Sequence, residues 1–346
     1  MHKKIKSYIY SPTYSITATV ESELLTSIDA LSKKAFIDNN EEALLSAHRI
    51  LYIINSAHLA NPWQDTPHHL MHPTITRIKY ILETSLEQAE RRKYNNIIND
   101  IPCVNDFSRW IKQFVGSHHS NELHPIFTFL RDKATFEQMR EFFFQESPLE
   151  MMFGDILAFM LPGVYGDIKV EFLKNYWDEV GHAKDERVHR NLRANLMDHL
   201  GIKRDCYISQ VDFLIREELE LTNLYLRLAT NRAKHTQLVG VMLATELMIP
   251  NRFQYSIDGW KRLGIKGEVL TYLIEHTSID EVHAEDWLEH VVIPILQEVP
   301  VSINNIMLGI LNRLDIAVSV LDRLYDKLQH THVSSVGVFK GSLNGL

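Results

Sequence analysis

The segment His276-Thr-Ser-Ile-Asp-Glu-Val-His283 carries two imidazoles and a carboxylate at intervals of four and three residues. At about 100° per residue, these intervals place His276, Asp280 and His283 on one stripe of an α-helix, within an arc of roughly 60°. Imidazoles and carboxylates one turn apart can bind a single iron, zinc or manganese ion. Acidic neighbours such as Glu281 leave a second interpretation open, in which the stripe is a solvated polar face.

A lone acid upstream is another candidate ligand. Glu246 lies in the apolar run Gly240-Val-Met-Leu-Ala-Thr-Glu-Leu-Met-Ile249, and its nearest charged neighbours are Lys234 and Arg252. A carboxylate buried in such a helix needs a cation, a proton or hydrogen bonds, because an unpaired buried charge is strongly unfavourable. The two interpretations are a metal ligand and a structural salt bridge with Arg252.

Glu179 and His189 flank a short segment that contains Gly181. In one continuous helix they would lie about 80° apart, whereas a break at Gly181 lets both side chains point at one centre. The pairs Glu179–His182 and Glu186–His189 also have the ExxH form of ferritin-like di-iron proteins. Those proteins take the two motifs from different helices, and here they lie on adjoining turns, so we reject that architecture. The remaining alternative is a helix end followed by a surface histidine.

The composition is that of a soluble globular protein, because 45% of the 346 residues are hydrophobic and 23% are charged. A formal net charge of −8 argues against a nucleic-acid-binding surface. Cys103 and Cys206 lack the spacing of a disulfide or zinc framework, which favours a reducing cytoplasm. We find no signal peptide and no apolar run long enough to span a membrane.

Apolar residues recur at three- and four-residue intervals along most of the chain, which predicts an all-α protein. We expect residues 1–20 to form an irregular arm, and residues 136–145 and 150–161 to form separate helices of a hairpin. The Asn99-Asp100-Ile101-Pro102 segment is the best boundary. It divides an N-terminal helical extension, residues 1–100, from a main domain, residues 101–332. A Ser- and Gly-rich tail, residues 333–346, follows.

Taken together, Glu179, His189, Glu246 and the His276-x-x-x-Asp280-x-x-His283 signature resemble the haem-oxygenase-like di-iron oxidase and oxygenase superfamily. The resemblance covers residues 130–300, roughly. It implies a helical bundle of the haem-oxygenase shape without haem, and two Fe(II) ions per chain. One ion would take Glu179, His189 and His283, the other His276 and Asp280, and Glu246 would bridge them.

The resemblance also implies that dioxygen oxidises a small amine- or amino-acid-derived substrate, by N-oxygenation or by cleavage of a C–C or C–N bond, in natural-product biosynthesis. Glu146, Glu150 and Asp155 are candidates for an additional carboxylate ligand, and Arg252 and Tyr255 for substrate binding. The alternatives are a cofactorless oxidase and a metal-free ligand-binding or interaction protein of the same fold. We expect a cytoplasmic protein with no membrane or nucleic-acid partner, and a homodimer formed through the extension.

Overall fold

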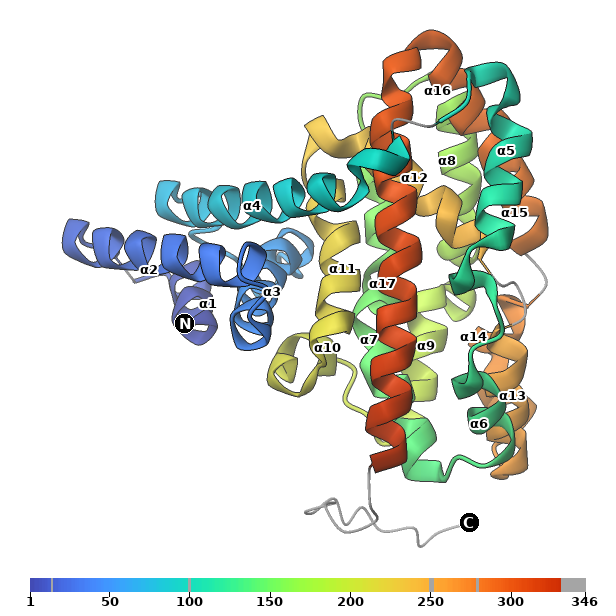
Figure 1. Cartoon of the computed structure of the whole chain (residues 1–346). Coiled ribbons are helices and arrows are strands. Elements are labelled where there is room, and N and C mark those ends of the chain that lie inside the picture. The colour runs from blue at the N-terminus through green and yellow to red at the C-terminus, as the bar shows by residue number, and fades with distance from the viewer. Residues whose placement is uncertain (14, 99–100, 249–251, 278–279, 331–346) are drawn as a thin grey trace, which may run out of the picture.

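The computed structural model describes residues 1–13, 15–98, 101–248, 252–277 and 280–330 (Figure 1). These residues form helices and their connections, and none of them forms a strand. The prediction of an all-α protein is confirmed. The predicted boundary at Asn99-Asp100 and the predicted tail, residues 333–346, lie outside the described residues.

The N-terminal extension is built from α1 (His2–Tyr10), α2 (Ala18–Phe36), α3 (Glu41–Ser56) and α4 (Pro73–Ile98). Figure 1 shows these helices to one side of the long helices of the main bundle. Most of their buried apolar side chains form a core separate from that of the bundle, whereas Tyr52 of α3 and Tyr94 of α4 belong to the core of the bundle. The extension contacts the bundle where α3 packs on α11 and α4 packs on α17.

The prediction of an irregular arm at the N-terminus is wrong. Residues His2–Tyr10 form α1, which packs on α3. Ile5, Tyr8 and Ile9 are buried there, at the three- and four-residue spacing of one helix face. The segment is short and marginal as an isolated helix, so tertiary burial decides its structure.

The main bundle contains thirteen α-helices among the described residues, and α17 runs along its whole length (Figure 1). Their bounds are α5 (Val104–Ser117), α6 (Pro125–Asp132), α7 (Phe136–Met160), α8 (Gly166–Glu179), α9 (His189–His199), α10 (Cys206–Ser209), α11 (Arg216–Ala229), α12 (His235–Leu247), α13 (Arg252–Arg262), α14 (Thr271–Glu275), α15 (Asp280–Trp287), α16 (Ile293–Glu298) and α17 (Ile303–His330).

Helix α7 is one continuous helix and corrects the predicted hairpin. It begins with a capping box at Thr135 and continues through Pro148. A proline removes the N–H that would bond the carbonyl four residues earlier, here that of Phe144. The Ser147 hydroxyl donates to that carbonyl oxygen at 2.6 Å, so the carbonyl keeps a partner and the helix continues. Glu146 and Glu150, on either side of Pro148, therefore share one rigid helix.

Helices α12 and α17 approach each other closely through two glycines. A Cβ atom at Gly240 would lie 2.0 Å from the backbone oxygen of Ile306, and one at Gly309 would lie 2.1 Å from that of Gln237. Only glycine permits backbones to come this near. The contact fixes the position of α12, whose last turn carries Glu246.

By length and composition α17 and the turn before it, Pro300–His330, could cross a membrane. However, 67% of its most apolar window is buried inside the bundle. A central helix surrounded by other helices is apolar all round for the same reason as a membrane span. The apolar composition is therefore explained by packing in the bundle, and the expected absence of a membrane partner stays a prediction.

Candidate metal centre and adjoining cavity

A sharp break between α8 and α9 brings Glu179 and His189 together. Gly181 has φ +61°, and His182 and Ala183 also have positive φ. A Cβ atom at Gly181 would lie 2.3 Å from the backbone carbon of Arg187, so the reversal requires glycine there. The chain turns back within a few residues, and the predicted break at Gly181 is confirmed.

The two side chains meet at the ends of their helices. His189 Nδ1 lies 3.0 Å from Glu179 Oε1, and His189 is 6% exposed. His189 Nε2 lies 3.6 Å from Glu275 Oε2. The other oxygen of Glu275 forms an ion pair with Arg187 Nη2 at 3.2 Å. Burial lowers the pKa of His189, but the Glu179 hydrogen bond and the charges of Glu179 and Glu275 outweigh it, so the pKa is raised overall.

His276 lies in a turn after α14, so the prediction that His276, Asp280 and His283 share one continuous helix is corrected. Helix α14 ends at Glu275, and His276 and Thr277 form a turn before α15 begins at Asp280. His276 Nδ1 lies 2.8 Å from the Tyr272 carbonyl oxygen and donates to it, which leaves Nε2 for another partner. The ring centroids of His189 and His276 are 4.6 Å apart.

Glu179, His189 and His276 each offer a ligand atom, and these atoms lie within 4.8 Å of one another. Two imidazoles and one carboxylate are the ligand types that non-haem Fe(II) sites use, and the hydrogen bond to Tyr272 supplies the orienting partner that metal-binding histidines need. The donor set therefore fits iron. Three of the six predicted ligands are brought together.

The other predicted ligands are placed less completely. Asp280 and His283 stand at the start of α15, but their side chains lie outside the described residues. Glu246 lines the same cavity as the three clustered ligands, without being one of the cluster.

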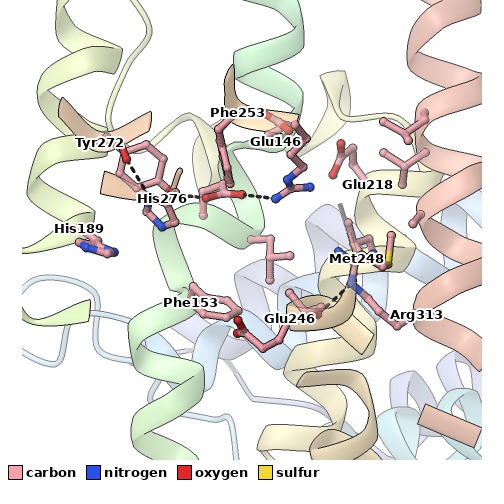
Figure 2. Close-up of a pocket in the computed structure, with 18 of the residues that line it drawn as sticks. Glu146, Phe153, His189, Glu218, Glu246, Met248, Phe253, Tyr272, His276 and Arg313 are labelled. Carbon is pink, nitrogen blue, oxygen red and sulfur yellow. Dashed lines mark hydrogen bonds and ion pairs between the residues drawn. The ribbon is translucent and has the colours of Figure 1, made fainter. Parts of the chain in front are cut away.

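A cavity of about 150 Å³ adjoins the three ligands (Figure 2). Its wall combines the metal ligands with further acids, two arginines and apolar side chains. The polar lining residues are Glu146, Glu150, Asn175, Asp178, Glu179, His189, Glu218, Thr245, Glu246, Arg252, Tyr272, His276 and Arg313. Sequence analysis named Glu146, Glu150 and Arg252, and the cavity contains all three.

Glu150 is held firmly between two donors. The Tyr272 hydroxyl donates to it, and Arg252 Nη2 lies 3.7 Å from its Oε1. Burial raises the pKa of Glu150, but the charges of Arg193 and Arg252 and the Tyr272 hydrogen bond outweigh burial and lower the pKa overall. Glu150 is therefore ionised at neutral pH. Because Tyr272 also holds His276 through its carbonyl oxygen, this acid is linked to the ligand cluster.

The pKa values of Glu146 and Glu218 are shifted in the opposite direction from that of Glu150. Burial raises the pKa of Glu146 to about 7, against the charges of Arg193 and Arg252. Burial, and then the charges of Glu146 and Glu150, raise the pKa of Glu218 well above its usual value. Glu218 is 2% exposed and was missed by sequence analysis. It stands in Arg216-Glu-Glu-Leu-Glu220, where three acids in the first turns of a helix resemble an ordinary solvated N-terminus.

Glu218→Gln is expected to stabilise the ligand-free protein at pH 8 by roughly 1–3 kcal/mol and to change stability little at pH 4. The wild-type carboxyl keeps its proton in the folded state at pH values where the unfolded chain releases it. Wild-type stability is therefore lost as the pH rises above the unfolded pKa of about 4.3. Urea denaturation at both pH values measures the difference. Equal stability differences at pH 4 and pH 8 would contradict the raised pKa.

Two predicted residues lie elsewhere. Asp155 forms an ion pair with Arg190 at 3.2 Å, and the Tyr255 ring packs against Phe127 and beneath the Arg131 guanidinium. Neither Asp155 nor Tyr255 is among the described residues that line the cavity. Arg313, which sequence analysis missed, does line it. Its signal was weaker than that of Glu246, because Asp315 follows two residues later and suggests an ordinary ion pair.

A second group of possible ligands, His118, His119 and Asp315, lies away from this cavity. Asp315 is already engaged, since Lys93 Nζ and the Tyr94 hydroxyl each lie 2.7 Å from its Oδ2. We therefore interpret these three residues as part of an ion-pair network and not as a metal site.

Residues 140–318 match the protein family described as iron-containing redox enzymes. A domain of unknown function with a haem-oxygenase-like fold from Shewanella denitrificans OS217 is 17% identical, with a TM-score of 0.42, and the match covers 71% of this chain and 93% of that one. A search of curated proteins finds no match. The family match spans α7 to α17 and therefore includes every residue of the ligand cluster and the acids of the cavity.

Proposed function

Since the chain belongs to the family of iron-containing redox enzymes, with the all-α, haem-oxygenase-like fold predicted for it, we propose that it is a non-haem iron oxygenase or oxidase. Its co-substrate is dioxygen and its substrate is a small amine- or amino-acid-derived molecule, which undergoes N-oxygenation or oxidative cleavage of a C–C or C–N bond. The observation that carries this proposal is the convergence of Glu179, His189 and His276 beside a cavity of about 150 Å³ (Figure 2).

In this proposal Glu179, His189 and His276 hold iron, which when bound supplies electrons and open coordination positions for dioxygen. The Tyr272 carbonyl oxygen orients the His276 ring, and Glu275 lies beside His189 on the side away from Glu179. Partners of this kind fix the orientation and raise the basicity of metal-binding imidazoles.

A second iron is proposed at Glu246, Asp280 and His283. Two observations support it. Glu246 lines the same cavity as the cluster, and α15 begins four residues after His276, with Asp280 and His283 in its first turn.

Glu150 is the best candidate for an additional carboxylate. It is ionised, it is fixed by the Tyr272 hydroxyl, and the charge of His276 contributes to its lowered pKa. Glu146 has a raised pKa, and Asp155 is turned toward Arg190. A carboxylate that is already charged and oriented binds a metal ion without first losing a proton.

An anaerobic Fe(II) titration of the full chain tests the proposal directly. Bound iron is expected to reach two per chain, and exposure to oxygen with a panel of amines and amino acids should accelerate oxygen consumption for the true substrate class. Saturation at one iron per chain would contradict the proposed second iron site. A protein that binds no iron, and whose ligand binding is unchanged in Glu246→Ala, would instead support a metal-free ligand-binding role.

A further inference from the structure

The two acids with raised pKa values lie across the cavity from the candidate metal ligands. Figure 2 shows His189 and His276 on one side and Glu218 on the other, with Glu146 between them in this view. Glu146 comes from α7 and Glu218 from α11, so two different helices place carboxyl groups in the same part of the cavity.

Neither carboxyl group has a hydrogen-bond or ion-pair partner among the described residues. This differs from Glu150, on the next turn of α7, which has both Tyr272 and Arg252. Buried carboxyl groups are nearly always paired, because desolvating them without a partner is costly. Among the described residues, therefore, no cation forms an ion pair with either acid.

The arginines of the cavity do not supply such a cation. Arg252 Nη2 is directed at Glu150, and Arg313 Nε donates to the Tyr225 hydroxyl at 2.7 Å and to Thr245 Oγ1 at 3.2 Å. Arg313 is 3% exposed, so these bonds fix its guanidinium in place. Both cations act on Glu218 over a distance, without an ion pair.

Much of the remaining cavity wall is apolar, and α17 contributes part of it. Ala317, Val320, Leu321 and Leu324 line it, together with Leu221 of α11. A cavity of about 150 Å³ is comparable to one that holds a molecule of benzene. A compact organic cation with an apolar stem fits this combination. A hard cation such as Ca²⁺ or Mg²⁺ fits it poorly, because such an ion takes about six oxygen ligands and the wall offers alkyl groups.

We propose that Glu146 and Glu218 bind the cationic nitrogen of the substrate, an alkyl ammonium or guanidinium group, and that Glu218 determines this specificity. The identification of that ligand as a substrate rests on the proposed function. The nitrogen is held on the side of the cavity away from His189, so the atom that is oxidised lies several bonds from it, toward the iron ligands. The apolar stem would then span the cavity from the acids toward the iron ligands.

Three probes with five carbon atoms each and different charge test this inference: n-pentylamine, n-pentanol and pentanoate. Isothermal titration of the anaerobic, Fe(II)-loaded full chain at pH 7.5 is expected to show that the amine binds at least about tenfold more tightly than the alcohol. Pentanoate should bind more weakly than either. Glu218→Gln and Glu146→Gln preserve side-chain shape and should each reduce the preference for the amine by about tenfold, with little change for the alcohol.

Glu220→Gln is the matched control, because this acid lies two residues along α11 and pairs with Arg216 outside the cavity. It should keep the wild-type preference. The inference is wrong if wild type binds pentylamine and pentanol equally, or if both glutamine variants fold, as judged by their thermal unfolding, and retain the preference.

The measurement also separates this inference from the proposed function. Iron content is determined on the same samples, and Glu218→Gln should keep the wild-type amount. If the protein prefers the amine but binds no iron, the cation site is supported and the proposed oxygenase function is contradicted. If the protein binds iron and consumes oxygen without any preference for the amine, only the cation site is contradicted.

Discussion

His276→Ala is expected to lower the affinity for iron by at least about 100-fold and to abolish iron-dependent oxygen consumption. The substitution removes one of three donors that lie within 4.8 Å of one another. It leaves the backbone of the turn after α14 intact, and alanine adopts the αR conformation of this position without strain. Iron analysis after anaerobic loading and an oxygen electrode measure the two effects.

His182→Asn is the control for this experiment. His182 lies in the α8–α9 break, between Glu179 and His189, but it pairs with Asp178 at 2.7 Å and its side chain is 49% exposed. Asparagine tolerates the positive φ of this position better than most residues. The control should bind iron as the wild type does. Unchanged iron affinity in His276→Ala, with a folded protein, would exclude His276 as a ligand.

Gly240→Ala is expected to destabilise the bundle by about 2–4 kcal/mol, which is large for the addition of one methyl group. The new Cβ atom would lie 2.0 Å from the Ile306 oxygen, and a backbone atom cannot move aside as a side-chain end can. Helices α12 and α17 must therefore separate. Since Glu246 stands in the last turn of α12, weaker iron binding should accompany the loss of stability. Urea denaturation and iron titration measure both.

Gly116→Ala is the matched substitution, because a Cβ atom at this helical glycine in α5 meets nothing within 4 Å. Alanine there should change stability by less than about 1 kcal/mol, in the stabilising direction. If Gly240→Ala were equally harmless, the close contact of α12 with α17 would not exist in solution.

The ligand cluster was largely predictable from the residues themselves. Metal-binding residue types are few, and their intervals are constrained by helix geometry, so His276, Glu179 and His189 stand out in the sequence. Gly181 signalled the break between Glu179 and His189, because glycine is the residue that most readily adopts the positive φ of a reversal. The structure confirms that break and corrects one detail, since His276 lies in a turn and not in a helix continuous with Asp280.

The continuity of α7 was not predictable from local rules. Pro148 ends or kinks a helix in most contexts, and the hydroxyl of Ser147 that satisfies the freed carbonyl is visible only in three dimensions. The short helix α1 is a similar case, because its stability comes from α3. In both places a tertiary or side-chain contact overrides a local preference.

The residue types and helical periodicity of the sequence determined that this protein is all-α and that it holds iron-type ligands, because both depend on spacing along one chain. The tertiary structure alone decided which acids share a buried space with those ligands. Glu217, Glu218 and Glu220 are equivalent in sequence, yet Glu218 lines the cavity and Glu220 faces Arg216. Burial and the charges of residues distant in sequence set the electrostatic state of a carboxyl group, and no local pattern encodes them.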